Sequence, residues 1–297
     1  MPLTLIKSIK VRKEILKMKK IIIALTLALA MLLPSCVSED TTNEPTDTTT
    51  EAQTTAPDNT TPQPTEVTLN IGSYNAAHFS KVDFDYSVFA NDINSKKLDI
   101  VGLQEVDYKT TRSNGHDQPK LLAQALGWEY YEFAKAIDYQ GGGYGHCIVS
   151  KYPIKSFTVH DLPGGGENRV FGHAVIDVNG VEINFINTHL SYEETDWRVK
   201  QFAFIAAYVK KLDNFIITGD FNTTDFTEYE VIPNATLVNN AKRSVLTFPA
   251  GGLTKSIDNI VVSPMFTLGR PKVLNNTHSD HVMLFTTVTY TLSEADE

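Results

Sequence analysis

Residues 214–222 read NFIITGDFN, and the fold and site predictions start from this stretch. Three apolar residues, 215–217, are followed by turn formers, which is typical of a short buried strand. Asp220 and Asn222 come next, separated by one residue. In an extended backbone such a pair projects to the same face, and α/β proteins place their chemistry at the mouth of a sheet. The alternative interpretation is an Asx turn that only ends the strand.

Outward from this stretch, strand and helix patterns alternate, with several hairpin-like strand pairs. Asn179-Gly180 is the strongest two-residue hairpin signal in the chain. Strands are predicted at 67–74, 98–103, 128–133, 145–150, 154–161, 169–178, 181–188, 215–218, 257–262 and 282–290, and helices at 84–97, 119–126 and 197–212. This order predicts a mixed sheet architecture with helices outside, rather than an all-parallel doubly wound fold.

Polar residues suited to metal or phosphate chemistry stand at six predicted strand ends. Taken singly, Glu105 is typical of a surface acid and His189 of a hydrogen-bonded core histidine. The set comprises Asn75, Glu105, His189, the Asp220/Asn222 pair, Asp258 and the Asp280-His281 pair. Because strand ends can meet in space, residues far apart in sequence can build one site. We therefore expect these side chains to converge.

The N-terminus has the pattern of a targeting segment. Lys19 and Lys20 precede 13 apolar-dominated residues, 21–33, which is short of the about 20 residues that a membrane span needs but suits a signal-peptide core. The stretch ending at Cys36 resembles a bacterial lipoprotein signal, with Met18 as the start of translation. The resemblance implies that residues 1–35 are removed and that Cys36 is lipidated, giving an exported protein anchored in the cell envelope. An ordinary secretory signal with an incidental cysteine is the alternative.

Residues 36–66 predict a disordered tether and residues 67–297 a single catalytic domain. The tether is rich in Thr and Pro, with seven acidic and no basic residues, so it has little apolar surface to bury. Without residues 1–35 the chain has 19 basic and 34 acidic residues, and the domain alone has a net charge of −8. No basic stripe is visible, which disfavours tight sequence-independent binding to nucleic acid. Cys147 lies in an apolar strand pattern that predicts a core residue rather than a nucleophile.

Six segments at the predicted strand ends resemble the endonuclease/exonuclease/phosphatase superfamily over about residues 67 to 290. They are SYN (73–75), DIVGLQEVD (99–107), INTHL (186–190), TGDFN (218–222), SIDNIVVS (256–263) and SDHV (279–282). The resemblance implies a four-layer α/β sandwich, with two packed mixed β-sheets and helices outside. TRSNGHDQ (111–118) and DYQGGGYGHCIVSKYPI (138–154) are similar to an insert of one bacterial branch, whose members often have Asn in place of His146 and an aromatic residue in place of Asn259.

The resemblance also implies roles for the strand-end residues. Glu105 is the expected principal ligand of Mg²⁺, with Asn75 beside it and Asp280 as a further ligand; Mn²⁺ is an expected substitute. Oxygen ligands without a Cys/His cluster suit Mg²⁺ better than zinc. The expected partner of His281 is Asp258, with the histidine acting as general base or as an electrostatic clamp.

Asp220 is expected to orient or deprotonate the attacking water, while Asn222 and His189 contact phosphoryl oxygens. Three further residues are substrate-binding candidates: Arg112, through a bidentate phosphate contact, and Tyr139 and Gln140, as lining of the cleft.

The predicted function is Mg²⁺-dependent hydrolysis of a phosphodiester by in-line attack of water. A sugar- or inositol-phosphate phosphatase and a sphingomyelinase-like lipid phosphodiesterase are alternatives on the same residues. A non-catalytic surface binding protein is the rival from another class. The expected partner is a phosphoester substrate, which is a small molecule, a lipid head group or a nucleic acid. The protein is expected to be a monomer that meets a membrane only through its lipid anchor.

Overall fold

The computed structural model describes residues 66–291, which form two mixed β-sheets. The first sheet contains β1 (Glu66–Asn75), β2 (Ile100–Tyr108), β3 (Tyr130–Tyr139), β4 (Gly142–Ser150), β11 (Phe266–Leu268), β12 (Lys272–Leu274) and β13 (Met283–Thr291). The second contains β5 (Ile154–Asp161), β6 (Val170–Val178), β7 (Val181–His189), β8 (Ile216–Asp220), β9 (Thr236–Leu237) and β10 (Asp258–Val262). The helices are α2 (Tyr86–Ser95), α3 (Gln118–Leu126) and α4 (Thr195–Val209), with 3-10 turns η2 (Ala77–Val82), η3 (Thr111–Ser113) and η4 (Phe226–Val231).

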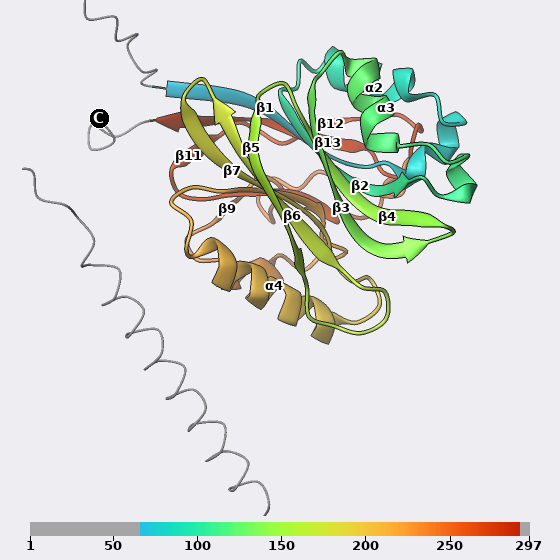
Figure 1. Ribbon diagram of the computed structural model, residues 1–297. Coiled ribbons are helices and arrows are strands. Elements are labelled where there is room, and N and C mark those ends of the chain that lie inside the picture. The colour runs from blue at the N-terminus through green and yellow to red at the C-terminus, as the bar shows by residue number, and fades with distance from the viewer. Residues whose placement is uncertain (1–65, 292–297) are drawn as a thin grey trace, which may run out of the picture. The chain divides into compact units, whose positions relative to one another are not determined.

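The two sheets pack face to face between outer layers of helix (Figure 1). One apolar cluster lies between the sheets, and two others lie on their outer faces, under α2 and α3 on one side and α4 on the other. Strand β8 shows how alternation builds these layers. Ile216 points into the central cluster, whereas Phe215 and Ile217 pack beneath α4. The four-layer α/β sandwich predicted from the sequence is therefore confirmed.

Each sheet of the described region contains one parallel strand pair. Strands β1 and β2 are parallel and are joined through α2, and β7 and β8 are parallel and are joined through α4. A parallel pair requires such a crossover, whereas the other pairings are antiparallel. The four parallel strands carry Asn75, Glu105, His189 and Asp220 at or near their carboxyl ends.

Two antiparallel neighbours bring further residues to the same edge. Strand β10 runs beside β8 and begins at Asp258, directly opposite Asp220. Strand β13 runs beside β1 and begins just after His281. A strand that runs antiparallel begins where its neighbour ends. This topology therefore places the polar residues of both sheets at one edge of the sandwich.

A buried amide ties the two sheets together beneath this edge. Asn187 Nδ2 donates to the carbonyls of Leu103 and Cys147, each at 2.9 Å. Its Oδ1 accepts from Gln104 Nε2 at 2.7 Å and from Thr218 Oγ1 at 3.1 Å. A Cβ at Gly102 would lie 2.6 Å from Asn187 Oδ1, so the close approach of the sheets requires glycine there.

The structure corrects several element predictions and confirms one core assignment. Strand β2 does not end at Glu105 but continues to Tyr108 through a register shift between Leu103 and Val106. The short strands β9, β11 and β12 were not predicted. Cys147 is buried in the cluster under α2 and α3, so the prediction of a core cysteine is confirmed. Cys36, the signal segment and nearly all of the tether lie outside the described residues. Within residues 66–291, no helix is long and apolar enough to cross a membrane.

Candidate active site

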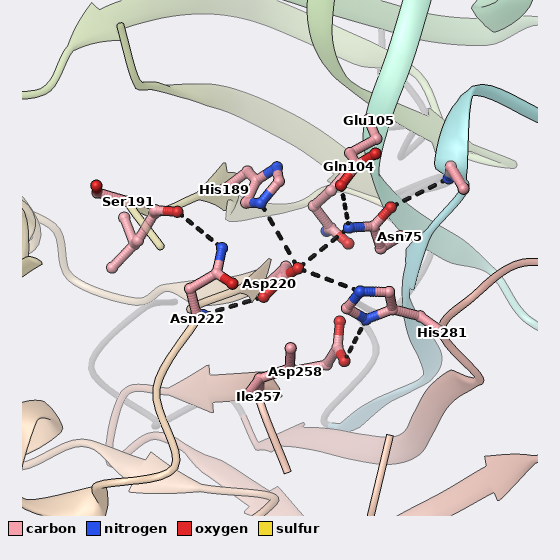
Figure 2. A network of polar contacts seen from close by, with 12 residues as sticks. Asn75, Gln104, Glu105, His189, Ser191, Asp220, Asn222, Ile257, Asp258 and His281 are labelled. Carbon is pink, nitrogen blue, oxygen red and sulfur yellow. Dashed lines mark hydrogen bonds and ion pairs between the residues drawn. The ribbon is translucent and has the colours of Figure 1, made fainter. Parts of the chain in front are cut away.

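Asp220 and Asn222 meet through a turn rather than along an extended strand. Strand β8 ends at Asp220, and Asn222 has a left-handed backbone with φ of 53°. The Asn222 backbone N–H donates to Asp220 Oδ1 at 3.0 Å, and its side-chain Nδ2 donates to the Leu190 carbonyl at 3.0 Å. The extended backbone expected between the two residues is absent, because the chain bends at this asparagine. The Asx turn does form, and both side chains nevertheless face one pocket (Figure 2).

His281 lies between two carboxylates. Its Nδ1 donates to Asp258 Oδ2 at 2.8 Å, and its Nε2 is 3.5 Å from Asp220 Oδ2 (Figure 2). Burial lowers the pKa of His281, but the charges of Asp258 and Asp220 and the hydrogen bond to Asp258 outweigh burial and raise it to about 10. The imidazole is therefore protonated at neutral pH. The pairing of His281 with Asp258 is as predicted.

Asp220 is the centre of the polar network. Its Oδ2 accepts from Asn75 Nδ2 at 3.1 Å and lies 3.6 Å from His189 Nε2. Burial raises the pKa of Asp220 despite the nearby His281 cation. Burial, followed by the charge of Arg169, holds the pKa of His189 well below its usual value. His189 is therefore neutral, and its contact with Asp220 is not an ion pair.

Glu105 reaches the site through a bulge in β2. Its φ of 55° is left-handed, which is uncommon for a residue other than glycine and costs backbone energy. The register shift in the β2–β4 pairing spans this residue, and bulges redirect side chains in this way. Asn75 Nδ2 donates to Glu105 Oε1 at 3.0 Å, so one amide holds both Glu105 and Asp220.

The oxygen-rich part of the site fits a hard divalent cation. Glu105 and Asp280 line the same pocket, and the charge of Asp280 adds to burial in raising the pKa of Glu105. A cation between two such carboxylates relieves their repulsion, and oxygen ligands suit Mg²⁺ or Mn²⁺. The oxygen of the Asn75 amide accepts from the Ala77 backbone N–H at 3.1 Å. Asn75 thus serves here as a donor to Glu105, and its role as a metal ligand stays a prediction.

A second group of ligand atoms has metal-like spacing. Atoms of Asp220, Asp258 and His281 lie within 4.8 Å of one another. Protonated His281 offsets one of the two carboxylate charges, and a protonated imidazole offers no lone pair to a metal. The Glu105 side of the site, with Asp280, stays the predicted position of the cation.

These residues surround an open pocket of about 710 Å³. Six predicted residues line it: Glu105, His189, Asp220, Asn222, Asp280 and His281. Asn75 and Asp258 are buried beside the lining and position it through the hydrogen bonds described above. The structure therefore brings all eight predicted strand-end residues together.

The three predicted substrate-binding residues lie outside this lining. Arg112 forms a bidentate ion pair with buried Asp107, through Nε and a terminal nitrogen at 2.8 Å each. Its guanidinium also stacks 4.5 Å from the Tyr139 ring centroid, and Gln140 accepts from Thr111 Oγ1 at 3.2 Å. The bidentate partner of Arg112 in the structure is thus a carboxylate of the chain itself.

Sequence reasoning missed four residues that matter for the site. Arg169, Tyr144 and Tyr192 line the pocket, and Asn187 joins the sheets beneath it. Arg169 stands just before β6, at the end of the glycine-rich loop 164–168. No periodicity marks these residues, because their partners lie on other elements. The available signals were an arginine where a predicted strand begins and, for Asn187 and Tyr144, their places in the segments INTHL (186–190) and DYQGGGYGHCIVSKYPI (138–154).

A family model for the "Endonuclease/Exonuclease/phosphatase family" matches residues 67–281. The chain belongs to the endonuclease/exonuclease/phosphatase family. Members of this family are hydrolases that act on phosphoesters, and the match spans every strand-end residue of the site. The resemblance noted in the sequence is thereby confirmed at the level of family and fold.

Solved structures of this family share the fold at low sequence identity. A family protein of Bacteroides thetaiotaomicron is 22% identical with a TM-score of 0.64, covering 76% of this chain and 99% of that one. A mannosyl-6-phosphatase of the same species is 21% identical with a TM-score of 0.63, covering 74% and 99%. D. rerio TDP2 complexed with a single-strand DNA product is 15% identical with a TM-score of 0.61, covering 74% and 98%.

The curated relatives include the uncharacterized protein YbhP of Escherichia coli K12. It is 27% identical over 143 residues, which are 44% of this chain and 56% of YbhP. The chain thus spans little more than half the length of this relative.

Proposed function

We propose that this protein is a metal-dependent phosphoester hydrolase of the cell envelope, using Mg²⁺ with Mn²⁺ as a substitute. One observation carries the proposal: protonated His281 faces the same pocket as the carboxylates Glu105 and Asp280. A phosphoester is an anion that needs positive charge where its negative charge develops. The lining of the pocket thus offers both a fixed cation and oxygen ligands for a metal cation.

The chain's own residues supply water orientation and charge. A bound metal ion would act as a Lewis acid on the phosphoryl oxygen and stabilise the leaving oxygen. Asp220, whose pKa is raised by burial, accepts a hydrogen bond from the attacking water and is suited to take its proton. Asn222 and neutral His189 donate to phosphoryl oxygens. The positive charge of His281 stabilises the negative charge that develops on the phosphoryl group. No covalent intermediate is required.

The size of the pocket limits the choice of substrate more than the identity of the catalytic residues does. Its volume of about 710 Å³ lies within the range typical of small-molecule sites, roughly 300–1,000 Å³. Two phosphoester classes suit the residues: the phosphodiester expected from the sequence, and a phosphate monoester of a small alcohol or sugar. Duplex DNA is disfavoured by the domain's net charge of −8. The solved structures that share this fold include a mannosyl-6-phosphatase.

A panel of phosphoesters tests this proposal. The purified protein is assayed with 4-nitrophenyl phosphate, bis(4-nitrophenyl) phosphate, sphingomyelin and plasmid DNA, in Mg²⁺ and in chelator. We expect chelator-sensitive hydrolysis of at least one small phosphoester and slow or absent cleavage of plasmid DNA. Replacing His281 with Gln should reduce the rate by roughly 100-fold or more, because removing one group that stabilises transition-state charge costs about 10²–10³-fold. Absence of hydrolysis of all four compounds would refute the enzyme assignment and favour a binding protein.

A further inference from the structure

Arg169 is a buried cation in the wall of the pocket. The proposed mechanism gives it no role. It lies directly before β6, in the second sheet, and only 4% of its surface is exposed. It lines the pocket together with Glu105 and His189. Burying a charged group is costly unless other groups pair with it and hydrogen-bond to it.

The guanidinium of Arg169 is poorly satisfied within the described residues. Its one ionic contact joins a terminal nitrogen to Glu167 Oε1 at 3.2 Å, and the Tyr192 ring centroid lies 6.0 Å away. Arginine carries five N–H donors, and the buried Nε donor of Arg169 has no hydrogen-bond partner among the described residues.

The other cationic side chains of the pocket are accounted for. Arg198 donates twice to Glu228, at 3.0 and 3.1 Å, and also to Thr195 and the Ser191 carbonyl. Lys255 is exposed, and its Nζ lies 5.9 Å from the Phe248 ring centroid. Arg169 therefore differs from both: it is buried, nearly unpaired and next to the residues expected to contact the phosphoryl group.

We propose that Arg169 binds the phosphoryl group of the substrate and makes this site select a phosphate monoester over a diester. This inference rests on the proposed function and adds the substrate class. A monoester carries a charge of about −1.5 to −2 at pH 7, whereas a diester carries a single negative charge. A guanidinium can bind two oxygens of a phosphate side by side, and a second ester group removes one of the terminal oxygens available for such a contact.

The surroundings of Arg169 support this assignment. After burial, the charge of Arg169 is the largest cause of the low pKa of His189, so the cation acts at the position where His189 meets the phosphoryl group. Glu167, its one ionic partner, is about one-third exposed. A phosphate dianion can therefore replace Glu167 as the partner without leaving a buried carboxylate behind.

Three variants test the proposal by two independent readouts. The first readout is kcat/KM for 4-nitrophenyl phosphate divided by kcat/KM for bis(4-nitrophenyl) phosphate. The second is the Kd of inorganic phosphate, measured by calorimetry in Mg²⁺. Replacing Arg169 with Gln should lower this monoester-to-diester ratio and weaken phosphate binding by roughly 10- to 100-fold each, the loss of one hydrogen-bonded charge. Replacing Arg169 with Lys should restore part of both.

Replacing Glu167, which is partly exposed, with Gln should change the affinity for phosphate in the opposite direction. Removing the competing carboxylate should tighten phosphate binding several-fold, and this result does not depend on the folding of an Arg169 variant. Arg112→Gln is the matched control, because Arg112 pairs with Asp107 outside the pocket; it should leave the ratio unaltered.

Three outcomes would overturn the proposal. These are an equal loss of both activities in Arg169→Gln, phosphate binding unaffected by that change, or weaker phosphate binding in Glu167→Gln. If the wild-type protein hydrolyses no phosphoester, the proposed function fails, and the phosphate-binding measurements still decide whether Arg169 is an anion-binding residue.

Discussion

Asp258 contributes most among the carboxylates that keep His281 protonated. Asp258 accepts from His281 Nδ1 at 2.8 Å, and its charge is the largest cause that raises the pKa of the imidazole. Asp258 is almost fully buried and does not line the pocket. It acts on the substrate only through the orientation and charge of His281.

Replacing Asp258 with Asn should therefore reduce kcat by roughly 100-fold or more while leaving KM less affected. The pKa of His281 falls when this charge is removed, and the imidazole loses the hydrogen bond that orients it, so it stabilises the charge of the transition state less well. Asp92→Asn is a matched control, because Asp92 pairs with His278 Nδ1 at 2.9 Å away from the pocket. Steady-state kinetics of both variants make the comparison; equal activities would exclude the role given to Asp258.

His146 predicts an acid-sensitive contribution to stability. It is buried, and burial, followed by the charge of Arg169, lowers its pKa to about 3. The unfolded chain binds a proton near pH 6.5, whereas the folded protein does not, so stability is full above pH 6.5 and declines as the pH falls toward 3. Between pH 7 and pH 5 the loss from this group is about 2 kcal/mol.

Urea unfolding at pH 7 and pH 5 checks this contribution. The wild-type protein should lose about 2 kcal/mol more than a His146→Asn variant over this interval. The comparison uses the change with pH, so a packing defect that affects the variant at both pH values cancels. Identical pH dependence in the two proteins would show that His146 is not held neutral.

The strands with clear alternation were predictable, and contacts between elements were not. The strands predicted at 67–74 and 181–188 are present as β1 and β7. Asn75 ends β1 and His189 ends β7. Strands of two or three residues, such as β9 and β12, carry no period to detect. Residue type, position at a predicted strand end and the family resemblance together identified the eight strand-end residues of the site. The left-handed backbone of Glu105 could not be foreseen, because it arises from the bulge between β2 and β4.

The contacts that Asn187 makes between the two sheets contribute to the stability of the fold. Its amide satisfies two backbone carbonyls of the first sheet and accepts from Gln104 and Thr218. Replacing Asn187 with Ala should destabilise the protein by about 3 kcal/mol or more, because each buried group left unpaired costs about 1–3 kcal/mol. Asn168→Ala, at an exposed amide, should cost well under half as much. Denaturant unfolding measures both, and similar losses would contradict the role of the buried amide.

At the scale of the whole molecule, the structure describes residues 66–291. The location of the protein in the cell is predicted from the sequence alone. The signal segment and Cys36 lie outside the described residues, so export and lipidation remain predictions. A lipid at Cys36 would hold the domain near a membrane through the tether of residues 36–66. The small pocket suits a soluble phosphoester in the space beside that membrane.

Expression of the full chain in a bacterial host with a radiolabelled fatty acid tests the anchor. The wild-type protein should carry the label and partition into detergent, and a Cys36→Ser variant should lose both properties. Cys147→Ser, at the buried core cysteine, is the control and should retain the label. Equal partition of the Cys36 variant and the wild type into detergent would refute lipidation.

The most direct measurement of the central claim is the rate of phosphoester hydrolysis as a function of Mg²⁺ concentration, in the wild-type protein and in Glu105→Gln. We expect a saturable dependence on Mg²⁺ in the wild type, abolished by chelator, and a large loss of both rate and apparent metal affinity in the variant. Glu182→Gln, at an exposed carboxylate that pairs with Lys155, should behave as the wild type. Hydrolysis that is independent of metal, or a Glu105→Gln variant with unaltered Mg²⁺ dependence, would contradict a metal-assisted phosphoesterase centred on these strand ends.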